Sequence, residues 1–308
     1  MAKLSMKHFL TGAELGRGDL EAMIDLGEKL RLERAEKKLR KDLEGMTLVA
    51  IFEKPSLRTH LSFSLAMIEL GGTVVDTFSA NRKHEEPEDV IRVLGGYAHA
   101  VAVRTFDQSL LERMATKAAI PVINALSNTH HPCQVLADLL TIKQSLGKLD
   151  GVELAYVGDG NNMLHSLLLL CPFLGIKLRY ACPRGYEPSA FIGKSAKQRA
   201  KEGGGSISAF ADPVQAIKGA QAVYTDVWAS MGFEKEEAAR EKAFEGFQLN
   251  GKLYAHAAPG ALVMHCMPMN RGQEITDEVA DHAHSVVFRQ SENRLHAQKA
   301  LLLKLLKG

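Results

Sequence analysis

One stretch near the N-terminus joins a strand-like run to residues that bind anions. The apolar run ends at Phe52, and Ser56, Arg58 and Thr59 follow before apolar residues recur at helical spacing. A helix start offers free backbone amides and the positive end of the helix dipole, which attract an anion, and the planar guanidinium of Arg58 suits phosphate. A helix N-cap at Ser56 or Thr59, with a solvated arginine beside it, explains the same residues. The pattern leaves both interpretations open.

A second polar turn follows the predicted strand 152–158. Gly158-Asp159-Gly160 begins like a dinucleotide-binding turn, but Met163 stands where the third glycine is needed, and the next strand ends without an acidic residue for a ribose. A nicotinamide site is therefore not expected. Asn161 and Asn162 either face a polar ligand or stabilise the turn itself.

A histidine and a glutamine precede and open another predicted helix. His131 and Gln134 flank Pro132, which suits a first helical turn. His131 could polarise a carbonyl, either as a neutral donor or as a cation, whereas the alternative is a helix-capping loop. The neighbouring His130 and Cys133 lack a workable ligand spacing, so no metal site is predicted.

Two further strand ends carry an acid and a thiol. Asp226 follows strand 221–225, and it either pairs with the cationic amine of an amino acid or is an exposed loop acid. Trp228 is predicted to be a packing residue. Cys266 follows strand 261–264 and is either a reactive thiol or a small buried hydrophobe. Because strand geometry points His265 to the opposite side, covalent catalysis is not favoured.

An arginine lies near the start of the last predicted helix. Arg294 is either a second anion contact or a surface arginine.

Strand-like and helix-like segments alternate along the whole chain, which predicts parallel sheets with helices on both faces. Long helical patterns occupy residues 18–42, 132–146 and 293–306. The charged tail of the first pattern, from Glu33 to Asp42, is expected to be solvated. A domain boundary is expected near 145–150. The predicted strands are 47–53, 73–77, 99–104, 120–123, 152–158, 176–181, 206–208, 221–225, 261–264 and 285–288.

The composition excludes several classes of protein. The chain has 308 residues, which favours two domains, and a formal net charge of +2, which gives no reason to expect nucleic acid or a membrane surface. The four cysteines are scattered, as is typical of free thiols in a reducing compartment. No signal peptide or membrane span is predicted, and we expect a cytoplasmic protein.

The order of these motifs resembles the aspartate/ornithine carbamoyltransferase family from end to end. The S-x-R-T motif for carbamoyl phosphate is present as Ser56-Leu57-Arg58-Thr59, and H-P-x-Q as His131-Pro132-Cys133-Gln134. The stretches Asp226-Val227-Trp228-Ala229-Ser230-Met231-Gly232 and His265-Cys266-Met267-Pro268 are similar to the ornithine branch in particular. The ending from Glu292 to Ala300 is similar as well.

The resemblance implies an α/β fold of two domains, each a mostly parallel sheet with helices on both faces, joined by interdomain helices. A carbamoyl-phosphate domain would span 1–146, with a C-terminal helix 291–308 packing back on it, and an ornithine domain 147–290. The implied reaction transfers the carbamoyl group to the side-chain amine of L-ornithine in arginine metabolism, giving L-citrulline and phosphate. Carbamoyl phosphate carries a good leaving group, so positioning and charge stabilisation suffice without a metal or cofactor.

The resemblance also implies a role for each site residue. Carbamoyl phosphate would be bound by Ser56, Leu57, Arg58, Thr59, Arg104, His131, Gln134 and Arg294 together with the Cys266-Met267 backbone. Ornithine would be held by Asn162, Ser230 and Met231, with Asp226 and Cys266 orienting its side-chain amine. The catalytic set is then Arg104, His131, Asp226 and Cys266. The 226–240 loop is the expected lid.

The family is built from trimers with shared active sites, so a homotrimer or a multiple of it is expected. This chain departs from the family pattern at Leu57, where threonine is usual, at His60, and at Met269-Asn270. Ala80 stands in place of the Gln or Lys that this loop lends to a neighbouring subunit. The alternatives are a carbamoyltransferase for another amine, such as putrescine, and a non-catalytic paralogue that binds phosphate.

Overall fold

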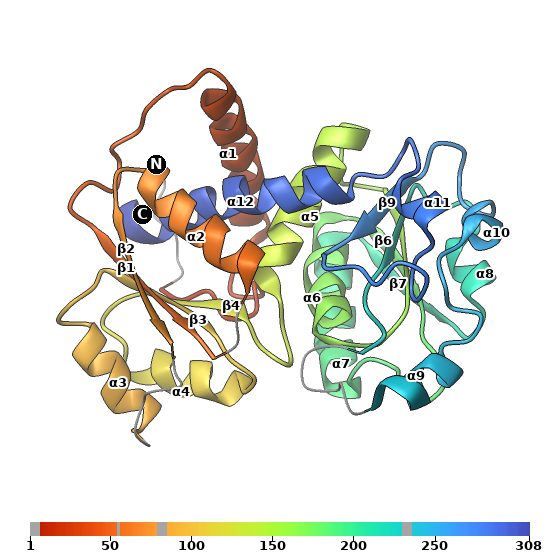
Figure 1. The fold of residues 1–308 in the computed structure, drawn as a ribbon, viewed down its shortest axis with the longest axis horizontal. Coiled ribbons are helices and arrows are strands. Elements are labelled where there is room, and N and C mark those ends of the chain that lie inside the picture. Colours follow the sequence, from red (N-terminus) through yellow and green to blue (C-terminus); the bar gives the residue numbers. More distant parts are fainter. Residues whose placement is uncertain (1–6, 54–55, 79–84, 230–235) are drawn as a thin grey trace. The chain divides into compact units, whose positions relative to one another are not determined.

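The computed structural model describes residues 7–53, 56–78, 85–229 and 236–308 (Figure 1). The chain divides into two compact units, which are described separately below. Unit 1 comprises Met1–Leu140 with Glu292–Gly308, and unit 2 comprises Thr141–Ser291. The boundaries fall inside two helices, α5 (Pro132–Leu146) and α12 (Val287–Lys307), so these helices carry the chain from one unit to the other.

Unit 1 is built on a parallel sheet in the order β2-β1-β3-β4. Its strands are β1 (Thr47–Phe52), β2 (Thr73–Phe78), β3 (Ala100–Arg104) and β4 (Val122–Leu126). The apolar runs of β1, β3 and β4 are typical of strands buried on both faces, whereas the edge strand β2 is largely exposed. Helices α3 (Pro87–Leu94) and α4 (Gln108–Lys117) contribute to a core with alternate residues of β1 and β3. Figure 1 shows α1 (Arg17–Ala35), α2 (Leu57–Glu69) and α12 on the other side of this sheet.

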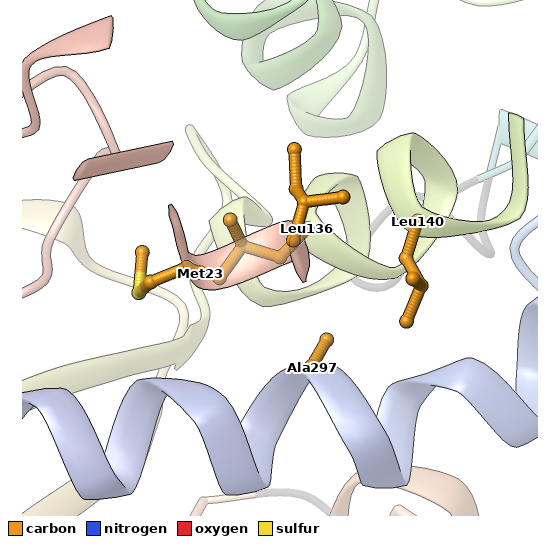
Figure 2. Close-up of a pocket in the computed structure, with 5 residues that line it drawn as sticks. Met23, Leu136, Leu140 and Ala297 are labelled. Atoms are coloured by element: carbon orange, nitrogen blue, oxygen red, sulfur yellow. The ribbon is translucent and has the colours of Figure 1, made fainter. Parts of the chain in front are cut away.

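An apolar contact joins three helices of unit 1. Met23 and Ile24 from α1 meet Leu136 and Leu140 from α5 and Ala297 from α12 (Figure 2). These residues carry no polar group, so this region packs helices rather than binding a polar ligand.

Unit 2 contains a second parallel sheet in the order β7-β6-β5-β8-β9. One core cluster joins β5, β8 and β9 to α8, α10 and α11. The strands are β5 (Glu153–Val157), β6 (Lys177–Ala181), β7 (Ser206–Phe210), β8 (Ala222–Thr225) and β9 (Leu262–His265). The helices are α6 (Asn162–Leu170), η2 (Pro172–Leu174), α7 (Ala190–Gly203), α8 (Pro213–Ile217), α9 (Glu237–Ala243), α10 (Gly251–Tyr254) and α11 (Asp277–Ala280).

The predicted two-domain α/β fold is confirmed, and nine of the ten predicted strand segments are strands in the described chain. The strand predicted at 285–288 is wrong. Only Ser285 forms an isolated bridge, with Val263, because α12 already begins at Val287. The short apolar run was compatible with either structure.

The first helix is shorter than predicted. It ends at Ala35 instead of continuing to 42, and Lys37 adopts a left-handed backbone with φ of 57°. Glu33 is buried rather than solvated, because it forms an ion pair with Arg40 beyond the end of the helix.

Candidate active site

The residues of unit 1 that are predicted to bind an anion lie where the strand order reverses. The chain leaves β1 towards β2 on one side, whereas β3 lies on the other side of β1. In parallel sheets, ligands bind at the carboxyl ends of the strands at such a switch point. Ser56 follows β1 and Arg104 ends β3, so the sheet brings these two residues together although 48 positions separate them.

The start of α2 is not closed by a side-chain cap. Ser56 occupies the N-cap position, but within the described residues its side chain caps no amide of the helix. Its hydroxyl oxygen instead accepts a hydrogen bond from Nη1 of Arg104 at 3.0 Å. The half-buried guanidinium of Arg58 forms no ion pair or hydrogen bond with another described residue. This arrangement favours the anion-site interpretation over the capping interpretation.

Thr59 and Arg294 extend the cationic side of this site. The Oγ1 atom of Thr59, which is 1% exposed, accepts hydrogen bonds from Nη2 of Arg294 at 3.1 Å and Nη1 of Arg104 at 3.4 Å. An arginine has no acceptor, so the hydroxyl proton of Thr59 remains available for a third group. Arg294 is buried, which contradicts the surface-arginine alternative.

Gln134 is held in one orientation by its neighbours. Its Oε1 accepts from Nη1 of Arg294 at 2.8 Å, and its Nε2 donates to Oδ1 of the buried Asp138 at 2.8 Å. Because the amide donates at one end and accepts at the other, flipping it would place like groups together at both contacts.

His131 is a neutral imidazole at physiological pH. Complete burial, followed by the positive charges of Arg294 and Arg104, holds the pKa of His131 well below its ordinary value. Of the two chemistries that the sequence left open, the structure therefore favours the neutral hydrogen-bond donor. The neighbouring Cys133 is also buried, which raises its pKa to about 12 and keeps it a thiol.

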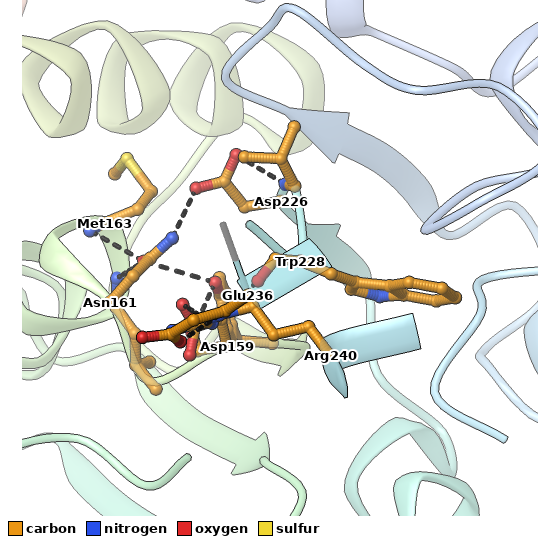
Figure 3. Close-up of polar contacts among 10 residues, drawn as sticks. Asp159, Asn161, Met163, Asp226, Trp228, Glu236 and Arg240 are labelled. Carbon is orange, nitrogen blue, oxygen red and sulfur yellow. Dashed lines mark hydrogen bonds and ion pairs between the residues drawn. The ribbon is translucent and has the colours of Figure 1, made fainter. Parts of the chain in front are cut away.

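The polar residues of unit 2 also meet at a switch point, here between β5 and β8. Asn161 follows β5 and caps α6, because its Oδ1 accepts from the amides of Met163 and Leu164. Its Nδ2 donates to Oδ2 of Asp226 at 2.8 Å, as Figure 3 shows. Asn161 therefore stabilises its own turn, as one alternative predicted, and also orients the acid that follows β8.

A buried ion pair reinforces the same turn. Nη1 of Arg240 in α9 donates to Oδ2 of Asp159 at 2.9 Å and to the carbonyl of Trp228 at 2.7 Å (Figure 3). Trp228 stacks on Phe244 and is a packing residue, as predicted. Gly160 is required here, since a Cβ at this position would lie 2.3 Å from the backbone nitrogen of Pro188.

Cys266 faces Asp226 rather than a catalytic base. Its half-buried Sγ donates to Oδ1 of Asp226 at 3.0 Å. His265 is completely buried and contacts Glu274 and the backbone of Met267 instead. A ring nitrogen of His265 lies within 4.8 Å of Sγ of Cys266, so the expectation that the two side chains point to opposite sides is wrong. Both ring nitrogens nevertheless have other partners, so the pair forms no cysteine–histidine nucleophile.

One group of side chains in the described residues has the composition of a metal site. Ligand atoms of Asp226, His265 and Cys266 lie within 4.8 Å of one another. Both ring nitrogens of His265 are engaged in protein contacts, and both carboxylate oxygens of Asp226 accept hydrogen bonds. The donor set is thus satisfied within the protein, and we assign no metal to it.

The structure groups the sequence-predicted residues into two sets. Unit 1 gathers Ser56, Thr59, Arg104, Gln134 and Arg294 through the hydrogen bonds described above. Unit 2 brings Asp226 and Cys266 together, with Asn162 as the first residue of α6.

Leu57 is the first residue of α2 and is 70% exposed. The predicted Ser230 and Met231, and Ala80, lie outside the described residues, as does the middle of the expected lid at 226–240.

Sequence reasoning missed the supporting residues Asp159, Arg240 and Glu274. Asp159 and Arg240 are 81 positions apart, so no local pattern joins them. The only available signals were the acid within a glycine turn and the histidine next to Cys266.

Comparison with known proteins identifies the family. The model for the carbamoyl-P binding domain of aspartate/ornithine carbamoyltransferase matches residues 7–144, and the model for the Asp/Orn binding domain matches residues 150–305. The chain belongs to the aspartate/ornithine carbamoyltransferase family. Of the residues predicted to bind an anion, Ser56, Arg58 and Thr59 fall within the first match, whereas Arg294 falls within the second together with Asp226 and Cys266.

Similar proteins from this family extend over almost the whole chain. An ornithine carbamoyltransferase from Parafrankia sp. is 46% identical, covering 98% of this chain and 97% of the relative. An anabolic ornithine carbamoyltransferase from Pyrococcus furiosus is 48% identical over 86% of this chain and 85% of the relative.

The solved structure of ornithine carbamoyltransferase from Pyrococcus furiosus matches with a TM-score of 0.96 and 42% identity, covering 100% of this chain and 99% of that one. In the described part of the chain, no helix is both long and apolar enough to cross a membrane.

Proposed function

We propose that this carbamoyltransferase transfers the carbamoyl group of carbamoyl phosphate to the side-chain amine of L-ornithine, producing L-citrulline and phosphate in arginine metabolism. The relatives described above carry the name of this activity. Each unit of the chain offers side chains suited to one of the two substrates.

The groups for carbamoyl phosphate come mainly from unit 1. The phosphate binds the amides at the start of α2, from Ser56 through Leu57 to Thr59, and the guanidinium of Arg58. Arg104 and the neutral His131 donate to the carbamoyl oxygen, and the Oε1 of Gln134 accepts from the carbamoyl amine. Arg294 holds Gln134 and Thr59 and adds positive charge.

The groups for ornithine come from unit 2. Asp226 and Cys266 orient the side-chain amine, and Asn162, Ser230 and Met231 hold the α-amino and α-carboxylate groups. The backbone of Cys266 and Met267 contributes to the carbamoyl pocket. An acceptor that lacks a carboxylate, such as putrescine, leaves part of this set unused.

The chemistry follows from these placements. The side-chain amine attacks the carbamoyl carbon as the free base, a nitrogen–carbon bond forms, and the bond from that carbon to the phosphate oxygen breaks. The nitrogen gives up one proton in the process, and the leaving phosphate takes up one proton to become hydrogen phosphate. Donors aimed at the carbamoyl oxygen stabilise the negative charge that develops there, and phosphate is a good leaving group.

The start of α2 carries this proposal. The guanidinium of Arg58 forms no ion pair or hydrogen bond with another described residue, and the hydroxyls of Ser56 and Thr59 accept from arginines, which leaves their protons free for an anion. The test is the simultaneous release of citrulline and phosphate from carbamoyl phosphate and L-ornithine. Equal amounts of the two products are expected, and phosphate release without citrulline would contradict the proposal.

We further propose a homotrimer or a multiple of trimers. The family resemblance suggests it, and α2 presents an exposed apolar stripe at helical spacing, with Leu61, Leu65 and Ile68 exposed by 46%, 38% and 59%. Light scattering at micromolar concentration should give at least three chain masses, and a monomer would contradict this. Ile68→Lys is expected to weaken assembly, whereas the control Leu39→Lys, at a site that is 94% exposed, should not.

A further inference from the structure

A completely buried histidine and glutamate lie directly behind the loop that carries Cys266. His265 ends β9, and its Nε2 lies 3.0 Å from Oε1 of Glu274, with both side chains 0% exposed. The other ring nitrogen, Nδ1, accepts a hydrogen bond from the backbone amide of Met267 at 2.9 Å. The proposed function gives neither side chain a role.

The contact with Met267 determines the tautomer of His265. A backbone N–H can only donate, so Nδ1 must be the unprotonated nitrogen. The ring proton therefore lies on Nε2 and is donated to Glu274. Exchanging the tautomer would oppose two donors at Met267 and two acceptors at Glu274, so the pair has one favourable arrangement.

Glu274 ties this arrangement to the far end of the loop. Its Oε1 also accepts from the amide of Asn270 at 2.6 Å, and its own carbonyl accepts from the amide of Leu249 at 2.8 Å. One carboxylate oxygen thus joins the side chain that starts the loop to the backbone that ends it.

The loop needs such a restraint because its backbone is unusual. Met267 has a φ of 61°, in the left-handed region, which costs a non-glycine residue on the order of 1–2 kcal/mol. The hydrogen bond from Met267 to His265 holds the chain in this conformation. The preceding residue is Cys266, whose Sγ donates to Asp226 at 3.0 Å.

We propose that His265 and Glu274 are positioning residues for the acceptor amine. They hold the Cys266–Met267 backbone so that the thiol and the Asp226 carboxylate face the side-chain nitrogen of ornithine together. This inference rests on the proposed function, since it assigns the pair to the orientation of that amine.

Two substitutions of His265 separate its two ring contacts. In His265→Asn, the amide oxygen takes the place of Nδ1 and accepts from Met267, but the donor to Glu274 is lost. In His265→Gln, the longer side chain places its amide near Nε2 and donates to Glu274, but the acceptor for Met267 is lost. Each variant therefore keeps one of the two contacts of His265 and loses the other.

The proposal predicts opposite orders for stability and activity. His265→Asn should be the less stable variant, because it leaves a larger cavity and removes one of the two donors to the buried carboxylate of Glu274. His265→Gln should be the less active one, with kcat/KM for ornithine reduced about 10- to 100-fold, as is typical when a supporting contact or a reacting geometry is lost. His265→Asn should retain more activity despite its lower melting temperature.

L-norvaline provides a matched probe, because it is ornithine without the side-chain amine. Its inhibition constant should change little in either variant, since His265 and Glu274 are proposed to position only the groups that face the side-chain amine. An activity order that follows the stability order, or an equal change for norvaline and ornithine, would overturn the proposal. If the wild-type chain itself does not carbamoylate ornithine, the proposed function fails first and this inference fails with it.

Discussion

Replacing Arg240 with methionine should make the stability of the protein depend on pH in a range where the parent protein does not. Arg240 and Asp159 form a buried ion pair whose side chains are 6% and 9% exposed. Burial raises the pKa of Asp159 to about 6, and the attraction of Arg240 opposes that rise. Without the guanidinium, the pKa of Asp159 rises further and the buried carboxyl is protonated at neutral pH.

The sign and the size of the effect follow from proton linkage. A raised folded-state pKa means that the native protein binds a proton which the unfolded chain has released, so stability falls as pH rises between the two pKa values. In the parent protein this window ends at about pH 6. In Arg240→Met it extends upwards, and the free energy of unfolding falls by about 1.4 kcal/mol per pH unit, within a total of about 3–5 kcal/mol for a broken buried pair.

Urea denaturation at pH 6 and pH 8 measures this directly. The difference in unfolding free energy between the parent and Arg240→Met should be larger at pH 8, by up to about 2.8 kcal/mol for two pH units. Asp159→Asn is the matched control, because an amide does not titrate. In that background, Arg240→Met should cost the same at both pH values, and an equal cost at both in the parent background would refute the reasoning.

Arg58→Ala removes the guanidinium that is proposed to bind the phosphate. It should reduce kcat/KM for carbamoyl phosphate by orders of magnitude, because a charge-assisted contact at the start of α2 is lost. Near-normal steady-state kinetics would contradict the proposed anion site. Cys266→Ser should raise KM for ornithine while leaving the circular dichroism spectrum unchanged, because the thiol is half-buried and contacts Asp226. Complete loss of soluble protein would instead make Cys266 a core residue. Leu57→Thr should lower KM for carbamoyl phosphate by adding a hydroxyl at the first residue of α2, and it should change stability by less than about 1 kcal/mol, since Leu57 is 70% exposed. A raised KM would show that this position does not face the phosphate.

The fold could be predicted from the sequence because its main signals are local. Buried strands read as short apolar runs, and α5 matches its predicted range of 132–146 because a first-turn proline and a glycine-containing break mark its ends. The strand prediction at 285–288 was wrong because short apolar segments are compatible with both a strand and a buried helix. Helix α1 ends at Ala35, before a left-handed Lys37, and Glu33 pairs with Arg40 beyond that end, and hydrophobic periodicity reports neither feature.

The site was predictable only in part. Ser56, Arg58 and Asp226 could be found because they follow strands, and strand ends meet at one edge of a parallel sheet. Asp159–Arg240 and His265–Glu274 could not be paired, since folding alone brings them together. The lowered pKa of His131 could not be predicted either, because it depends first on burial and then on the charges of Arg294 and Arg104, which are distant in sequence.

The central claim is tested most directly by measuring ureido-product formation from carbamoyl phosphate with four amines side by side: L-ornithine, L-aspartate, N-acetyl-L-ornithine and putrescine. We expect turnover with L-ornithine alone, because only this amino acid offers a free side-chain amine to Asp226 and Cys266 with its α-amino and α-carboxylate groups both available. Turnover with another of these amines would contradict the assigned acceptor. No turnover with any of them, in a folded protein that still binds carbamoyl phosphate, would contradict the enzymatic account and favour a phosphate-binding paralogue.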